Sequence, residues 1–210
     1  MRERLPGLLL FLPVPIVLWL FTRAPLGVAP SIALGVALVA THRFYARPFA
    51  LARAERRCLW CGGPAESGAP LAVAEPFGVT DWRACRPEHQ RSLTRFLAFA
   101  ASHAAALKLG ILGSLALFLP AAIAADAGRL GFLSYADTRA FFRFAIACTV
   151  LPLGWLGESR GRSGGGAPRV PFPVHIQALI GTRAVLWLFR LVGIVWLVLS
   201  VVYAAFRVAG

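Results

Sequence analysis

Four residues in one polar stretch of the chain have the types and the spacing of metal ligands. Cys58 and Cys61 are separated by two residues, and Cys85 and His89 by three. Cysteine sulfur and histidine nitrogen are preferred ligands of structural Zn²⁺, and two such pairs can close on one tetrahedral ion. The sequence therefore predicts a Zn²⁺ site formed by Cys58, Cys61, Cys85 and His89.

The residues beside each pair favour this geometry. Gly62 and Gly63 follow the second thiol and supply the unusual backbone dihedrals of a tight turn around a metal. Near the second pair, Pro87 suits a first helical turn, and a helical pattern begins near Ser92. We therefore expect Cys85 and His89 to share one face of a helix.

Residues 71–82 lie between the two pairs and predict two short strands around a Pro-Phe-Gly turn. The order of a Cys-x2-Cys turn, a hairpin and a ligand-bearing helix, over residues 57–95, resembles a treble-clef zinc finger. A Cys-x3-His pair stands where that family more often has a second Cys-x2-Cys pair. The resemblance implies a bound metal and an α+β shape, but no particular activity.

Other uses of a Cys-x2-Cys motif fit the sequence less well. A thioredoxin-like redox motif would lie in a βαβ pattern, and haem attachment would need a histidine where Gly62 stands. A catalytic Zn²⁺ keeps one position for water, which would require that His89 does not coordinate. Four protein ligands close the site, so we expect a structural ion.

The rest of the chain has the composition of a membrane protein. Hydrophobic residues make up 58% of the 210 residues, above the roughly 45–50% of soluble domains. Five apolar segments are candidate membrane spans, at residues 5–21, 26–40, 107–125, 140–156 and 184–205. The predicted fold is an all-α polytopic membrane protein of about five transmembrane helices with a small α+β zinc-binding cytoplasmic insert.

This pattern divides the chain into five parts. They are an N-terminal transmembrane hairpin at 1–47, a zinc-binding module at 53–95, two transmembrane helices within 96–157, a flexible basic linker at 158–173, and an interfacial lead-in with the final span at 174–210.

Small residues recur at every fourth position in the second span and in the helical stretch that leads into the third, which is typical of closely packed membrane helices. One set is Gly27, Ser31 and Gly35, and the other is Ser102, Ala106, Gly110 and Ser114. We expect the two sets to face each other.

The arginines predict the orientation. They concentrate in residues 1–4, 43–95 and 160–183, so the positive-inside rule places the N-terminus and the zinc module in the cytoplasm and the C-terminus outside. Abundant arginine with a single lysine, together with many Ala, Gly and Pro residues, suggests a high-GC bacterial genome. We therefore expect the protein in a bacterial inner membrane. All nine acidic residues lie outside the five predicted spans, which disfavours a proton-coupled carrier or a cation pump.

Two charged residues within apolar segments are candidates for contact with anions. Lys108 and Arg190 both fall toward the predicted cytoplasmic side, where they could reach lipid headgroups or line a cationic pocket. The net charge of +13 is better explained by a bilayer with anionic headgroups than by nucleic acid.

No catalytic signature motif is present in the sequence. The favoured interpretation is a membrane scaffold or accessory subunit, without catalysis, whose module binds a protein partner at the cytoplasmic face. Two alternatives stay open. One is a metal-responsive or metal-handling membrane protein with exchangeable Zn²⁺, and the other is a membrane enzyme or binder acting on anionic lipid-linked substrates.

Overall fold

The computed structural model describes residues 5–23, 28–65, 68, 70–76, 78–160 and 167–209. Most of these residues are helical, and the two strands form one antiparallel hairpin. The elements in chain order are α1 (Leu5–Phe11), α2 (Pro13–Arg23), α3 (Val28–Thr41), the π-helical turn η1 (His42–Ala46), α4 (Arg47–Leu51), β1 (Leu71–Glu75), β2 (Gly78–Trp82), α5 (Pro87–Ser102), α6 (Ala104–Lys108), the π-helical turn η2 (Leu109–Gly113), α7 (Ser114–Asp126), α8 (Tyr135–Arg160), α9 (His175–Ile180) and α10 (Thr182–Ala209).

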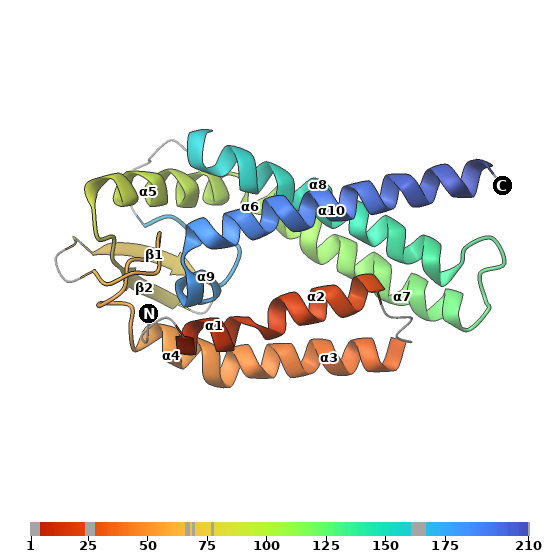
Figure 1. The fold of residues 1–210 in the computed structure, drawn as a ribbon, viewed down its shortest axis with the longest axis horizontal. Coiled ribbons are helices and arrows are strands. Elements are labelled where there is room, and N and C mark those ends of the chain that lie inside the picture. The colour runs from red at the N-terminus through yellow and green to blue at the C-terminus, as the bar shows by residue number, and fades with distance from the viewer. Residues whose placement is uncertain are drawn as a thin grey trace.

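The elements separate into a mixed end and a helical end (Figure 1). The hairpin, α5 and α9 gather at one end, and the α7–α8 connection and the C-terminus lie at the other. Three helical stretches are long and apolar enough to cross a membrane: Ala104–Asp126, Tyr135–Gly157 and Thr182–Ala209. The helical class, the apolar helices and the small sheet agree with the prediction.

The N-terminal segments form shorter helices. The predicted first span is divided at Leu12 into α1 and α2, because Pro13 and Pro15 lack the N–H groups that a continuous helix requires. The predicted second span corresponds to α3, which continues through η1 into α4. Figure 1 shows α1 and α2 lying beside α3 as one layer.

The fourth predicted span starts earlier than expected. Helix α8 begins at Tyr135 rather than near residue 140, because Ser134 and Asp137 cap its first turn. The Ser134 backbone N–H donates to Asp137 Oδ2 at 2.7 Å, and the Asp137 N–H donates to Ser134 Oγ at 3.2 Å. This reciprocal pair is a capping box.

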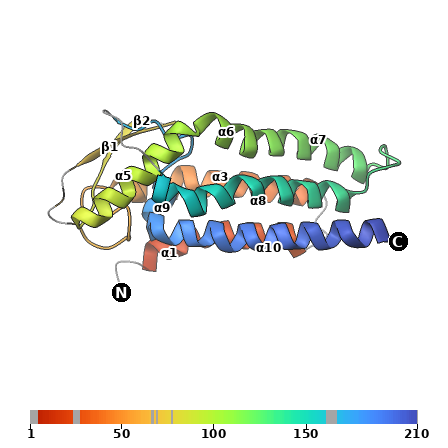
Figure 2. The same ribbon diagram turned by 90° about the horizontal axis from the view of Figure 1, so that it is seen from above.

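Helices α8 and α10 run side by side along the molecule (Figures 1 and 2). Small residues make the close approach possible: a Cβ on Gly193 of α10 would lie 2.7 Å from the Leu151 Cγ of α8. A Cβ on Gly110 of η2 would lie within 3 Å of Thr149 side-chain atoms, also on α8.

The predicted contact between the two sets of small residues does not form at Gly110 or at Gly35. Gly110 faces α8 rather than α3, and a Cβ on Gly35 would meet nothing within 4 Å. Gly27 lies outside the described residues. The four-residue spacing thus indicated that the helix around Gly110 packs closely against a neighbour, but it did not indicate that this neighbour is α8.

A continuous core joins the module to the last two helices. Its fully buried side chains include Leu59, Trp82, Leu93, Phe96, Leu97, Leu179 and Leu186. Leu179 belongs to α9 and Leu186 to α10, so the predicted zinc module shares its apolar interior with the region predicted as a separate lead-in and span.

The segment predicted as a linker, 158–173, is bonded to the hairpin near its end. The Ala74 N–H donates to the Pro168 carbonyl at 3.1 Å, and the Val170 N–H donates to the Ala74 carbonyl at 3.0 Å. Helix α8 extends to Arg160, and residues 161–166 lie outside the described part. The chain therefore returns along β1 before it enters α9.

Candidate metal centre

The structure brings the four predicted ligands together. Their ligand atoms all lie within 4.8 Å of one another. The Cys61 and Cys85 Sγ atoms are 3.7 Å apart, and His89 Nδ1 lies 3.7 Å from Cys58 Sγ and 3.2 Å from Cys85 Sγ. Ligands of a tetrahedral Zn²⁺ are separated by about 3.5–3.8 Å. Cys58, Cys61, Cys85 and His89 thus form a group positioned to hold one metal ion.

The first pair lies on a tight turn held by backbone hydrogen bonds, here called the knuckle, residues 58–63. The Gly62 N–H donates to the Cys58 carbonyl at 2.8 Å, and the Cys58 N–H donates to the Gly63 carbonyl at 2.7 Å. Gly62 has a φ of +68°, which glycine adopts without strain. The turn therefore depends on the glycine that directly follows the second thiol.

The second pair has a different geometry from the one predicted. Helix α5 begins at Pro87, and Arg86 before it is extended, with φ −147° and ψ 153°. A residue that precedes proline is disfavoured in the helical region, so the helix cannot reach back to Cys85. The prediction that Cys85 and His89 share a helix face is wrong, but the extended turn still brings Cys85 to His89.

The thiols influence one another's ionisation. Burial, the largest effect, acts to raise the pKa of Cys58, but hydrogen bonds from the backbone and thiols of Cys61 and Cys85 outweigh it, and the net pKa is lowered. Burial, hydrogen bonding and the charges of Cys58 and Cys61 raise the pKa of Cys85 to about 12. A thiolate at Cys58 therefore disfavours ionisation of Cys85.

The knuckle is joined directly to the start of α10. The Leu59 carbonyl accepts from the Thr182 N–H at 2.8 Å and from its Oγ1 at 3.0 Å, and the Trp60 carbonyl accepts from the Arg183 N–H at 3.0 Å. The first amides of a helix have no partner within the helix. The residues between the two thiols therefore cap the longest apolar helix.

Gly181 makes this contact possible. It has a φ of +97°, and a Cβ there would lie 2.7 Å from both the Cys61 carbonyl carbon and the Gly62 nitrogen. A side chain at this position would force the knuckle and α10 apart.

Glu75 ties the hairpin to the start of α9. Its carboxylate accepts from the Trp82 indole N–H at 3.1 Å and from the Val174 N–H at 2.9 Å. Burial raises the pKa of Glu75, partly opposed by these hydrogen bonds and by the charge of Arg47. The hairpin, the knuckle and the last two helices are thus connected by polar contacts as well as by the core.

The two residues predicted to contact anions lie in different surroundings. Lys108 is exposed on α6. Arg190 donates from Nε to the Gly154 carbonyl at 2.7 Å and lies over the rings of Trp155 and Trp187. Arg190 lines a cavity next to the metal centre, whereas Lys108 is not part of that lining.

A buried histidine pair was missed by sequence reasoning. His42 and His175 lie near each other with ring centroids 6.2 Å apart and are 8% and 3% exposed. Their ring nitrogens have no hydrogen-bond partner among the described residues. Burial lowers the pKa of both rings, and the charges of His42 and Arg47 help to lower that of His175 to about 4. No spacing in the sequence links the two positions.

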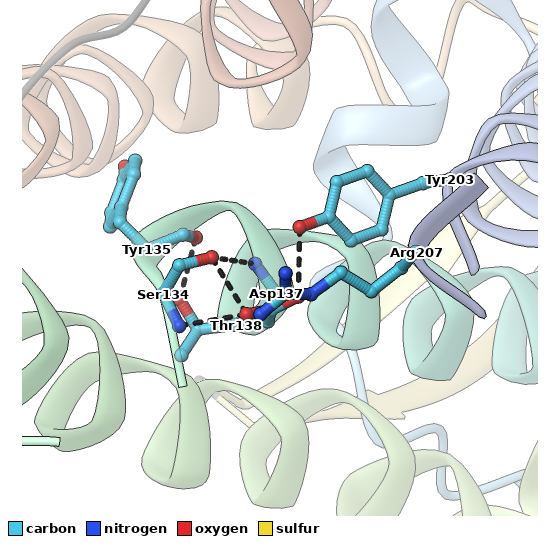
Figure 3. A network of polar contacts seen from close by, with 6 residues as sticks. All are labelled: Ser134, Tyr135, Asp137, Thr138, Tyr203 and Arg207. Atoms are coloured by element: carbon cyan, nitrogen blue, oxygen red, sulfur yellow. Dashed lines mark hydrogen bonds and ion pairs between the residues drawn. The ribbon is translucent and has the colours of Figure 1, made fainter. Parts of the chain in front are cut away.

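A second polar cluster lies at the opposite end of α8 and α10 (Figure 3). Asp137 accepts from the Ser134 hydroxyl at 2.7 Å and from the Tyr203 hydroxyl at 2.8 Å, and Arg207 Nε is 3.6 Å from its Oδ1. Sequence reasoning missed this cluster, although the Ser134-x-x-Asp137 spacing signals a helix start. It joins the first turn of α8 to the last turns of α10.

No protein-family model, curated protein or solved structure matches this chain.

Proposed function

We propose that the protein is a five-span inner-membrane scaffold or accessory subunit. One structural Zn²⁺, bound by Cys58, Cys61, Cys85 and His89, holds its cytoplasmic module in shape, and the module presents a surface to a partner protein. The observation that carries this proposal is the group of four ligand atoms, two of which lie on the turn that caps α10.

The donor set favours Zn²⁺ and a structural role. Three sulfurs and one imidazole nitrogen suit Zn²⁺ better than a harder cation, which prefers oxygen. A tetrahedral ion held by four protein ligands has no position left for a reacting water. The order of knuckle, hairpin and ligand-bearing helix supports assignment of residues 57–95 as a treble-clef module.

The position of the module supports a role in assembly. Because the knuckle carbonyls bond to Thr182 and Arg183, the ion fixes the module against the last predicted span. The module and that span also share one apolar core. A partner bound to the module would thereby be held in a defined orientation relative to the membrane.

The metal content of the purified protein tests the site. We expect one Zn²⁺ per chain by elemental mass spectrometry, lost in Cys58→Ser, Cys85→Ser and His89→Ala. Cys148→Ser is the matched control, since Cys148 is exposed on α8 away from the cluster, and it should keep its metal. Metal retained in His89→Ala would favour an open, catalytic ion, and wild-type protein without metal would contradict the proposal.

The rate of metal exchange separates a scaffold from a metal-handling protein. A closed structural site should release Zn²⁺ to a weak chelator over hours rather than seconds. Fast release with the fold intact would favour a metal-responsive function instead.

Purification from native membranes tests whether a partner protein binds the module. A protein that co-purifies with the wild type and with Cys148→Ser, but not with Cys58→Ser, is the expected result. Equal co-purification with all three would show that the zinc module is not the platform.

In the proposed five-span topology, the module lies inside the cell. Glu66→Cys in a Cys148→Ser background should react with a membrane-impermeant maleimide only after the membrane is opened. Labelling of intact cells would contradict the proposed orientation. A C-terminal reporter active only outside the cytoplasm would support the odd number of spans.

A further inference from the structure

A cavity of about 310 Å³ lies between the metal centre and the first turns of α10. Its lining residues are Trp60 from the knuckle, His89 from α5, and Arg183, Leu186, Trp187 and Arg190 from α10. The cavity therefore opens where the zinc module meets a candidate membrane span.

Apart from His89, the polar side chains of this lining are all hydrogen-bond donors. Guanidinium groups and indole rings donate and do not accept, and none of the described lining residues carries a carboxylate. Two arginines in one small cavity also supply two positive charges. A positively charged lining that is rich in hydrogen-bond donors suits an anion with several acceptor oxygens.

His89 adds a directed donor. Its Nδ1 faces the thiols, so Nε2 is the nitrogen left for a second interaction. A metal-bound histidine ordinarily donates its other ring N–H to an acceptor. Within the described part of the chain, no hydrogen bond from His89 Nε2 is present, and His89 itself lines the cavity.

The two arginines lie on one side of α10. Arg183, Trp187 and Arg190 are spaced four and three residues apart, which places them on one helix face. Arg190 is held in place by its bond to the Gly154 carbonyl and by the rings of Trp155 and Trp187, 5.0 and 4.9 Å from its guanidinium carbon. Such fixed side chains lose little conformational entropy when a ligand binds.

We propose that this cavity binds the phosphate group of an anionic membrane phospholipid, between the Arg183 and Arg190 guanidiniums and the His89 Nε2–H. A lipid is the favoured source because Trp187 is 59% exposed in the first turns of a candidate span, and tryptophan at a span end is typical of the membrane surface. Inorganic phosphate offers the same oxygens and is the soluble competitor for the same site.

Native mass spectrometry of the delipidated, zinc-loaded full chain in detergent tests this proposal. Phosphatidylglycerol and phosphatidylcholine are titrated separately, with and without millimolar inorganic phosphate. We expect phosphatidylglycerol to bind more tightly, and Arg183→Gln to weaken its binding about fivefold, the order expected for one basic residue at an anionic surface. Arg183→Lys should retain most of the binding, because it keeps the charge.

Arg129→Gln is the matched control, since Arg129 is exposed in the connection between α7 and α8, which lies at the opposite end of the molecule from the module (Figure 1). This variant should bind phosphatidylglycerol like the wild type. Displacement of the lipid by inorganic phosphate would support the site and identify soluble phosphate as a competing ligand, and no displacement would identify the lipid as the ligand. Equal affinity for the two lipids without any effect of phosphate, or an unchanged affinity in Arg183→Gln, would overturn the proposal. Zn²⁺ content, measured on each variant, separates this result from a failure of the metal site.

Discussion

Helices α8 and α10 lie side by side, and different kinds of interaction hold the two ends of this helix pair. At the module end, α10 begins against the knuckle carbonyls, which are main-chain groups positioned by the metal ligands. At the other end, side chains of α10 reach the first turn of α8 through Asp137 (Figure 3). The start of α10 thus depends on a turn that carries two of the four candidate metal ligands, whereas its end depends on side-chain contacts.

The comparison predicts a large loss of stability when the metal ligands are changed. Cys58→Ser removes a ligand that is 1% exposed, and metal binding to small zinc modules contributes on the order of 10 kcal/mol to folding. We expect the thermal unfolding midpoint to fall by about 10 °C or more, measured by scanning calorimetry in detergent. Cys148→Ser should shift it by no more than a degree or two, and equal shifts would contradict a special role for Cys58.

Gly181→Ala should break the contact between the knuckle and α10 while leaving all four ligands in place. A non-glycine residue at φ +97° is strained, and its Cβ would overlap the knuckle backbone. We expect a loss of about 1–3 kcal/mol in the free energy of unfolding, measured by denaturant titration.

Gly131→Ala is the matched control for Gly181→Ala, because a Cβ at Gly131 would meet nothing within 4 Å. It should change the free energy of unfolding by less than about 0.5 kcal/mol. If Gly181→Ala were equally mild, the close contact between knuckle and helix would not hold in solution.

Asp137→Asn should weaken the contact between the start of α8 and the end of α10, and it should not change the metal content. The carboxylate accepts hydrogen bonds from Ser134 and Tyr203, and loss of its charge should destabilise the protein by about 1–2 kcal/mol. Zn²⁺ content should remain at the wild-type value. Loss of metal in this variant would show that the two ends are coupled rather than independent.

Arg207→Gln should have the smallest effect. The Arg207 side chain is 64% exposed and its Nε lies 3.6 Å from Asp137, and exposed ion pairs contribute less than about 1 kcal/mol. High salt should reduce even this difference between variant and wild type. A larger loss, insensitive to salt, would mean that Arg207 has a packing role.

The clustering of Cys58, Cys61, Cys85 and His89 could be predicted because the spacing within each pair is local. Each pair is set by a few residues of sequence, and the hairpin between the pairs brings the two together, as the Leu71–Trp82 register shows. The helical pattern near Ser92 predicts a helix that in fact begins at Pro87, and the proline also keeps the preceding Arg86 extended. That effect, rather than a shared helix face, brings Cys85 to His89.

The remaining contacts join positions far apart in the sequence. Leu59 and Thr182 meet through backbone atoms, which leave no pattern of residue types. No periodic pattern in the sequence indicates that His42 and His175 are buried near each other. Gly110 shows a related limit, since a small residue marks a close approach but does not identify the helix that approaches.

Hydrogen exchange at the start of α10 tests most directly whether the metal holds this helix to the module. The amides of Thr182 and Arg183 would be followed by mass spectrometry in the zinc-loaded wild type and in Cys58→Ser. The amide of Asp137, which donates to Ser134 at the far end of the helices, is the internal reference. We expect exchange at Thr182 and Arg183 to become at least about tenfold faster without the metal, and exchange at Asp137 to stay the same. Equal protection of Thr182 and Arg183 in the two proteins would show that α10 begins independently of the metal centre.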